Sequence, residues 1–118
     1  MQIFTRKVIC IIQHIPAGSV MSYGQVAAIA GSPRAARQVV RILHTMSERY
    51  RLPWHRVVNR EGKVMLSDML SRQLQITALR EEGVAVDEEG TLELQRYMYQ
   101  LDSLKWCEIL SELCGEEI

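Results

Sequence analysis

The sequence predicts a mainly α-helical domain in which two short helices joined by a tight turn precede a small β-hairpin. Apolar residues recur at helical spacing over residues 3–15, and a Gly-Ser-Pro turn at residues 31–33 separates two further helical stretches. A Glu-Gly pair at residues 61–62 then lies between two short runs that contain valine. A helix pair of this kind is a helix-turn-helix, and the hairpin that follows makes the motif a winged helix-turn-helix.

The first helix is expected over residues 3–15. Its apolar side chains share one face, which indicates packing against a core; they are Ile3, Phe4, Val8, Ile11, Ile12 and Ile15. Cys10 lies in the same stretch and is expected in the core. The Pro-Ala-Gly sequence at residues 16–18 ends the helix, because proline and glycine both interrupt helical structure.

The helix-turn-helix is expected over about residues 22–46. Ser22 is a good N-cap for a helix that runs to Ala30, and Gly31 ends it. The second helix begins with Ser32 as its cap and Pro33 in its first turn, where the missing N–H costs nothing. It presents Arg34, Arg37, Gln38 and Arg41, while Val39, Val40, Ile42 and Leu43 supply its buried side. Such a helix commonly enters a DNA groove, although helix-turn-helix pairs also serve as plain scaffolding.

The second half of the chain continues this alternation. Strands are expected at residues 56–59 and 63–66, with the turn at residues 61–62 between them. A helix follows from Met69 and stops at Gly83, with an apolar face made by Leu70, Leu74, Ile76, Ala78 and Leu79. A second small hairpin is expected around Glu89-Gly90. Residues 101–118 form an acidic amphipathic helical tail, whose Trp106, Ile109, Leu110 and Leu113 dock on the domain or on a partner.

Composition excludes several classes of protein. The apolar share of 47% and the charged share of 24% are typical of soluble globular domains. No apolar run reaches the roughly 20 residues of a membrane-spanning helix, and the first residues lack a signal-peptide pattern, so the expected location is cytoplasmic. The cysteines and histidines are scattered, which predicts neither a disulfide framework nor a metal site. They are Cys10, Cys107, Cys114, His14, His44 and His55. No cofactor is expected.

The net charge of zero hides a division between the two halves of the chain. Residues 1–63 hold ten basic and two acidic residues, a net charge of +8, whereas residues 64–118 hold four basic and twelve acidic residues, a net charge of −8. Such asymmetry indicates that the basic half meets a polyanion. A solvated surface with unevenly spread charges is the alternative reading.

Four sequence motifs, in order, point to one family. The stretches "IPAGSVMSYGQVA", "GSPRAARQV", "LPWHRVVN" and "REEGV" resemble the carboxy-terminal DNA-binding domain of the O6-alkylguanine-DNA alkyltransferases. More closely, the chain resembles the alkyltransferase-like proteins, which carry Trp where the enzymes carry their acceptor Cys. The resemblance covers roughly residues 5–99, so the expected organisation is a DNA-binding domain at residues 1–100 followed by the tail at residues 101–118.

The resemblance implies a mode of DNA binding. The helix-turn-helix would approach double-stranded DNA from the minor groove, and an O6-alkylguanine would be rotated out of the base stack. Arg37 would fill the gap left by the base, and Tyr23 would help to rotate the nucleotide through its 3′ phosphate. The DNA-binding residues implied in this way are Ser22, Tyr23, Gly24, Arg34, Ala35, Ala36, Arg37, Gln38 and Arg41. Arg56 and Arg60 are further candidates for phosphate contacts.

The resemblance also implies a pocket without catalysis. The residues expected to line the lesion pocket are Tyr23, Trp54, Val57, Val58 and Ser67. Trp54 stands where the transferase has its thiol, and an indole has no lone pair with which to displace an alkyl group. His55 and Glu82 would be structural remnants of the proton relay, so no catalytic residue is expected. The family implies a monomeric sensor that flags lesions for nucleotide-excision-repair proteins.

Alternatives remain for the residues and for the whole chain. Trp54 would be a core aromatic residue if it stood alone, Arg37 one more solvated arginine, and Tyr23 a helix-packing residue. The loop at residues 63–72 lacks the glycines and the Tyr usual in the enzymes, and Val40 stands where the family has a glycine. The competing functions are a divergent alkyltransferase that uses another cysteine and a sequence-specific winged-helix transcription factor.

Overall fold

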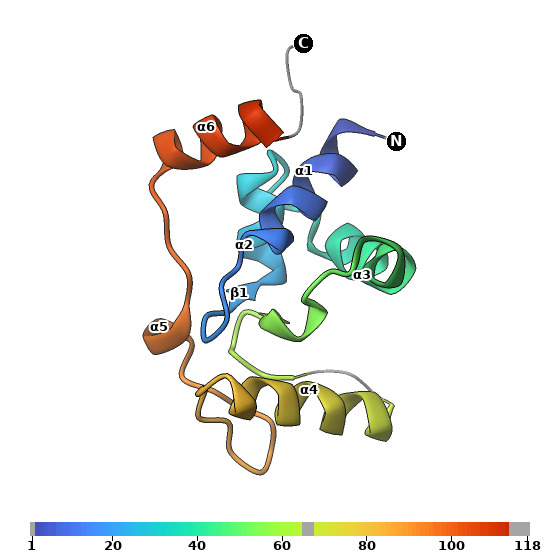
Figure 1. The fold of residues 1–118 in the computed structure, drawn as a ribbon, viewed down its shortest axis with the longest axis vertical. Coiled ribbons are helices and arrows are strands. Elements are labelled where there is room, and N and C mark those ends of the chain that lie inside the picture. The colour runs from blue at the N-terminus through green and yellow to red at the C-terminus, as the bar shows by residue number, and fades with distance from the viewer. Residues whose placement is uncertain (1, 65–67, 114–118) are drawn as a thin grey trace.

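The computed structural model describes residues 2–64 and 68–113, and it is mainly helical (Figure 1). One end of the molecule gathers α1 (Ile3–Gln13), α2 (Tyr23–Ile29), α3 (Ala36–Tyr50) and α6 (Ser103–Leu113). The other end holds α4 (Met69–Glu81), and α5 (Leu94–Tyr97) lies along one side. Between the two ends run β1 (Met21–Ser22), η1 (Trp54–Arg56) and β2 (Val57–Val58). No helix in the described part of the chain is long and apolar enough to cross a membrane.

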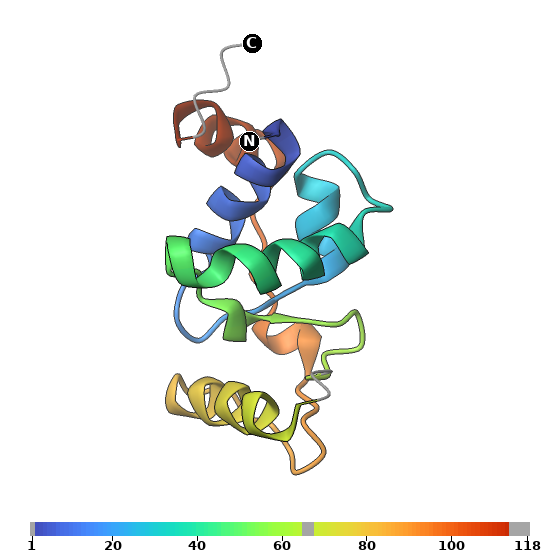
Figure 2. The ribbon, with the colours of Figure 1, turned by 90° about the vertical axis from the view of Figure 1, so that its right-hand side faces the viewer.

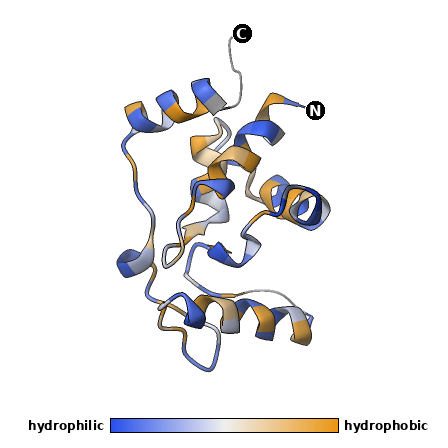
Figure 3. Ribbon diagram, viewed as in Figure 1, coloured by the Kyte–Doolittle hydropathy of each residue, from blue (hydrophilic) through white to orange (hydrophobic). Residues whose placement is uncertain are grey.

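The core consists of two apolar clusters on either side of β2. One cluster lies among α1, α2, α3 and α6 and includes Val57, and the other lies beside α4 and includes Val58. Both valines are fully buried, because successive side chains of a strand point to opposite faces. Figure 3 shows apolar residues on all the longer helices, although burial separates those in the core from exposed ones such as Leu70 and Leu104. The short strand β2 therefore joins the two halves of the core.

The predicted wing hairpin is wrong in its pairing. The chain does turn at residues 59–63, where the Asn59 N–H donates to the Lys63 carbonyl at 3.2 Å. However, β2 pairs in parallel with β1, with Met21 opposite Val57 and Ser22 opposite Val58. Lys63 instead pairs with Thr91. Sequence proximity favours a hairpin, whereas the observed parallel pair connects segments far apart in the chain; residues 65 and 66 lie outside the described residues.

The second predicted hairpin is confirmed. Val86 and Leu92 form an antiparallel bridge, and the Asp87 N–H donates to the Thr91 carbonyl at 3.0 Å. The Asp87 carboxylate also accepts the Glu89 and Thr91 N–H groups at 2.9 Å each. This side chain therefore closes the turn in which Gly90 takes a φ of 85°.

Helix α3 is displaced from its predicted bounds. It begins at Ala36, with Ala35 and not Ser32 as its N-cap, because residues 32–35 form a separate turn in which the Ala35 N–H donates to the Ser32 carbonyl at 2.9 Å. Pro33 therefore lies in this turn and not in the helix. The helix runs past residue 46 to Tyr50, since no glycine or proline interrupts it, and it ends at Arg51 in the left-handed conformation with φ 53°.

Helices α4 and α6 bury different residues from those that apolar spacing alone indicates. Leu70 and Leu74 are 69% and 54% exposed, which corrects their predicted place in the core, because α4 packs through Gln75, Ile76 and Leu79. In α6, Trp106 and Leu110 are buried against the cluster that contains α1. Of the two possibilities left open by the sequence, the domain itself or a partner, the structure shows the domain for Trp106 and Leu110. Leu113 lies where side chains are not described.

Candidate nucleic-acid interface

The polar face of α3 is exposed along the helix. Arg37, Gln38 and Arg41 are exposed, as is Arg34 in the turn before the helix, while Val39 and Ile42 on the opposite side are buried. Ala35 and Ala36 are half-buried at the start of the helix, and their own side chains are small. Figure 2 shows α3 crossing the middle of the molecule, with the turn that leads into it projecting at one edge. The predicted DNA-contacting side chains of α3 therefore share an accessible surface.

The start of α2 is fixed by a capping box. The Ser22 Oγ accepts the Gln25 N–H at 3.0 Å, and the Gln25 Oε1 accepts the Ser22 N–H at 3.3 Å. The Gln25 side chain also donates to the Tyr99 carbonyl at 2.8 Å. Ser22 is thus buried with its hydroxyl in the cap, which is a structural role in addition to any contact with DNA.

Tyr23 and Gly24 follow this cap at the first turn of α2. Tyr23 is half-buried against the core, and burial raises the pKa of its phenol, so its hydroxyl stays protonated and can donate a hydrogen bond. A methyl group built on Gly24 would meet no atom within 4 Å, so the backbone here is open on that side.

Trp54 is the first residue of η1 and is half-buried. Its backbone N–H donates to the Leu52 carbonyl at 2.8 Å. Its indole ring meets the His55 ring edge-on, with centroids 6.4 Å apart. Val57 and Val58, which the resemblance places in the lesion pocket, have side chains that are fully buried in the two core clusters. Ser67 lies outside the described residues.

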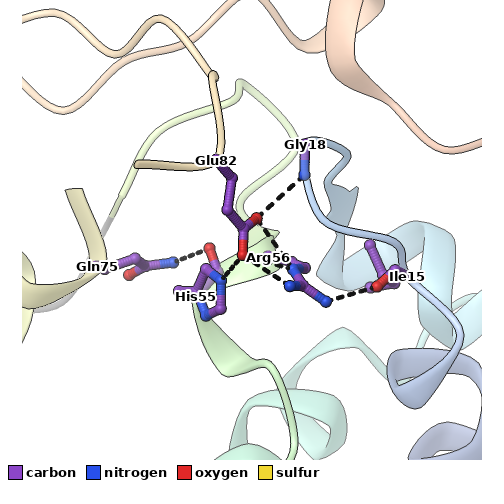
Figure 4. Close-up of polar contacts among 6 residues, drawn as sticks. All are labelled: Ile15, Gly18, His55, Arg56, Gln75 and Glu82. Carbon is purple, nitrogen blue, oxygen red and sulfur yellow. Dashed lines mark hydrogen bonds and ion pairs between the residues drawn. The ribbon is translucent and has the colours of Figure 1, made fainter. Parts of the chain in front are cut away.

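The carboxylate of Glu82 joins three segments of the chain (Figure 4). Its Oε2 lies 2.7 Å from the His55 Nε2 and 2.6 Å from the Arg56 Nη2, and its Oε1 accepts the Gly18 N–H at 3.1 Å. Arg56 continues the network by donating from Nη1 to the Ile15 carbonyl at 2.8 Å. The predicted contact between His55 and Glu82 is therefore confirmed, and it is part of a larger cluster.

Charge and hydrogen bonds keep Glu82 ionised. Burial acts to raise the pKa of this carboxyl, but hydrogen bonds from Arg56, His55 and the Gly18 N–H outweigh it and lower the pKa to about 2. An ionised carboxylate only accepts hydrogen bonds, so the His55 Nε2 must carry a proton. The pair is arranged to hold the turn at residues 54–56 in place.

Two residues of this cluster have roles that the sequence did not indicate. Arg56 was a candidate for a phosphate contact, but its guanidinium is committed to Glu82 and to the Ile15 carbonyl, which corrects that assignment. Gln75 is buried in α4 and donates to the backbone beside Arg56. A search for apolar periodicity treats Gln75 as polar and so passes over it. Among the described residues, no group of histidine, cysteine and acidic side chains could hold a metal ion.

Comparison with known proteins agrees with this geometry. The family described as "6-O-methylguanine DNA methyltransferase, DNA binding domain" matches residues 3–84. The DNA base-flipping protein of Escherichia coli strain K12 is 50% identical over 97 residues, which cover 81% of this chain and 74% of that protein. Alkyltransferase-like protein 1 of Schizosaccharomyces pombe is 35% identical over 102 residues, which cover 82% of this chain and 94% of that protein.

The fold has a similar counterpart among solved structures. The crystal structure of S. pombe Atl1 in complex with damaged DNA containing O6-carboxymethylguanine superimposes with a TM-score of 0.76 and 35% identity. The match covers 83% of this chain and 95% of that chain. The exposed face of α3, the capped start of α2 and the Trp54 turn thus lie in a framework shared with these proteins. The chain belongs to the 6-O-methylguanine DNA methyltransferase DNA-binding-domain family, among its alkyltransferase-like members.

Proposed function

We propose that this protein binds O6-alkylguanine in DNA by rotating the nucleotide out of the duplex, and that it leaves the alkyl group in place. The observation that carries the proposal is Trp54 at the head of the turn that His55 and Glu82 hold in position. The relatives named for base flipping, and the solved complex with a damaged guanine, support the DNA-binding part.

The chemistry of Trp54 supports the absence of transfer. Displacement of the alkyl group requires a nucleophile such as a thiolate, whereas the indole nitrogen is a hydrogen-bond donor only. Two cysteines in the described part of the chain are free, but Cys10 lies in α1 and Cys107 lies in α6, both in elements other than η1. What the indole offers instead is a broad apolar surface for an alkyl group and a purine edge.

The surface of α3 supports nucleotide flipping. Ala35 and Ala36 allow the backbone to approach a groove closely, and the exposed Arg37 follows them directly. A guanidinium can stack on neighbouring bases and donate to the orphaned partner base, which offsets part of the few kcal/mol that flipping costs. Tyr23 supplies a neutral hydroxyl at the start of α2 for a phosphate. Alkylation at O6 weakens pairing, so the damaged base is easier to extrude than a normal one.

In this proposal the complex acts as a signal rather than as an enzyme. The protein works as a cytoplasmic monomer, and the bound lesion is passed to nucleotide-excision-repair proteins. The charge division supports one part of this scheme, because the acidic half repels DNA and stays available to another partner.

Binding titrations with O6-methylguanine, bulky O6-alkylguanine and undamaged duplexes test the proposal. Arg37→Ala should weaken binding to the damaged duplex strongly, because the inserted side chain is lost. Arg49→Ala, in the last turn of the same helix, is the matched control and should bind like the parent. Trp54→Ala should lower the preference for alkylated over normal guanine. Equal affinity of Arg37→Ala and the parent for damaged DNA would contradict flipping.

Two further measurements separate the alternatives. Mass spectrometry after incubation with O6-methylguanine DNA should show an unchanged protein mass, and a gain of one methylene would identify a transferase. Gel-shift comparison of unrelated sequences should show dependence on the lesion and not on the sequence. Strong dependence on a defined sequence, without preference for the alkylated base, would identify a transcription factor instead.

A further inference from the structure

The inference concerns Gln75, a buried amide in the middle of α4. Its side chain is 2% exposed, and Gln75 and Ser22 are the two polar residues buried in the described part of the chain. Burying a polar side chain costs free energy unless the side chain forms hydrogen bonds inside the protein. The role of Ser22 is accounted for by its helix cap, whereas Gln75 lies away from any helix end.

The amide of Gln75 is bonded to the backbone of the Trp54 turn. Its Nε2 donates to the His55 carbonyl at 3.1 Å and to the Val57 carbonyl at 3.0 Å, the two carbonyls that flank Arg56. Figure 4 shows Gln75 reaching this turn from one side while Glu82 and Ile15 meet it from others. Among the described residues, β2 pairs with a strand on one side only, which is β1. Gln75 of α4 supplies hydrogen-bond donors where a second neighbouring strand would otherwise supply them.

Gln75 in α4 and Glu82 at its C-cap both form hydrogen bonds with the turn at residues 55–57. Glu82 is the C-cap residue that directly follows the last turn of α4, seven positions and about 10 Å of rise after Gln75, a spacing that places both residues on the same side of the helix. Glu82 bonds to the side chains of His55 and Arg56, and Gln75 donates to the main-chain carbonyls of His55 and Val57 on either side of Arg56. Together they leave η1 little freedom to shift or rotate, and η1 is the segment that begins with Trp54.

We propose that Gln75 is a positioning residue for lesion recognition, which fixes the main chain of the turn so that the Trp54 ring meets the extruded base in one orientation. This inference rests on the proposed function. A methionine of similar size would fill the same space but would remove the donor that Gln75 supplies to the His55 and Val57 carbonyls. A glutamate would place acceptors against those carbonyls. Position 75 therefore requires a side chain that can donate hydrogen bonds, because its acceptors are the carbonyls of the turn that carries Trp54.

The test compares lesion preference, defined as the affinity for an O6-methylguanine duplex divided by that for the undamaged duplex. Gln75→Met should lower the preference by about tenfold, the effect of losing buried hydrogen bonds, while affinity for undamaged DNA changes little. Gln73→Met, exposed on the same helix, should behave like the parent. Gln75→Lys restores a donor on a side chain long enough to reach, and it should recover part of the preference; Gln75→Glu should not.

A spectroscopic signal reports on the ring itself. The chain has two tryptophans, so a Trp106→Phe background leaves Trp54 as the sole indole fluorophore. Damaged DNA should change its emission in the Gln75 parent, and the change should shrink in Gln75→Met. A folded Gln75→Met with unchanged preference and unchanged emission overturns the inference, as does an equal loss of affinity for both duplexes. If Gln75→Met fails to fold, equal preference for Gln75→Lys and Gln75→Glu overturns it.

The outcome for the parent separates the two proposals. A parent that shows no preference for the damaged duplex contradicts the proposed function itself. A parent with a clear preference that all Gln75 variants keep contradicts only the positioning role.

Discussion

At the scale of single residues, His55 and Glu82 have a structural role: they hold the turn that carries Trp54. His55 and Glu82 were expected to meet because the resemblance implied it, and their contact is confirmed at 2.7 Å. The hydrogen bonds from Arg56 to the same carboxylate could not be predicted. In the basic half of the sequence, an arginine resembles a solvated surface charge until the structure shows its partner. Glu82 therefore serves the fold around Trp54, whether or not a proton ever moves.

The lowered pKa of Glu82 predicts how stability depends on pH. Its folded-state pKa of about 2 lies below the ordinary 4.5, so the carboxylate stabilises the fold above pH 4.5 and loses this contribution as pH falls toward 2. Glu82→Gln should remove that part of the acid sensitivity and cost about 2 kcal/mol at neutral pH, the value of charged hydrogen bonds.

Urea unfolding of the parent and variant between pH 2 and pH 7 measures the difference. Glu81→Gln changes an exposed neighbouring carboxylate and is the matched control, which should keep the profile of the parent. Parallel profiles for Glu82→Gln and the parent would show that the carboxylate is not stabilised in the folded state.

At the scale of elements, local signals predicted the helices better than the pairing. The capped start of α2 and the end of α4 just before Gly83 follow from residue types that act within one turn of helix. The start of α3 was misplaced because Ser32 and Pro33 suit a helix start and a β-turn equally well. The partner of β2 depends on contacts between distant segments, and no local pattern encodes it.

Helix α6 should contribute to the stability of the domain through one residue above all. Trp106 is buried between His14 and Tyr99, whose rings meet it edge-on with centroids 6.3 and 6.2 Å away. Trp106→Ala should therefore cost about 3 kcal/mol or more and lower the melting temperature by about 10 °C or more. Leu104→Ala, on the 77% exposed residue of the same helix, should change stability by less than about 0.5 kcal/mol.

Calorimetry of both variants beside the parent measures these effects. An equal melting temperature for Trp106→Ala and the parent would show that α6 does not pack on α1 in solution. A large effect of Leu104→Ala would show instead that its side chain is buried in solution.

At the scale of the whole molecule, the basic and acidic halves of the sequence contribute to different surfaces. The sequence predicts that basic residues gather in its first half, but it does not show which of them are available. The structure leaves Arg34, Arg37 and Arg41 exposed together and withdraws Arg56 into the network of Glu82. The 84–93 segment, whose Asp87, Glu88, Glu89 and Glu93 are exposed, lies at the far end beside α4 (Figure 1). One surface therefore suits a polyanion, and the opposite end does not.

This separation predicts a salt dependence that follows α3 alone. Each phosphate neutralised by a basic side chain releases counterions, so the logarithm of affinity falls with the logarithm of salt concentration, by about one unit of slope per contact. Arg34→Gln and Arg41→Gln should each lower this slope by up to about one. Arg96→Gln removes an exposed charge on α5 and should leave the slope unchanged. Titrations at several salt concentrations with an undamaged duplex measure the slope, and an equal loss for all three variants would mean that net charge, and not the α3 surface, drives binding.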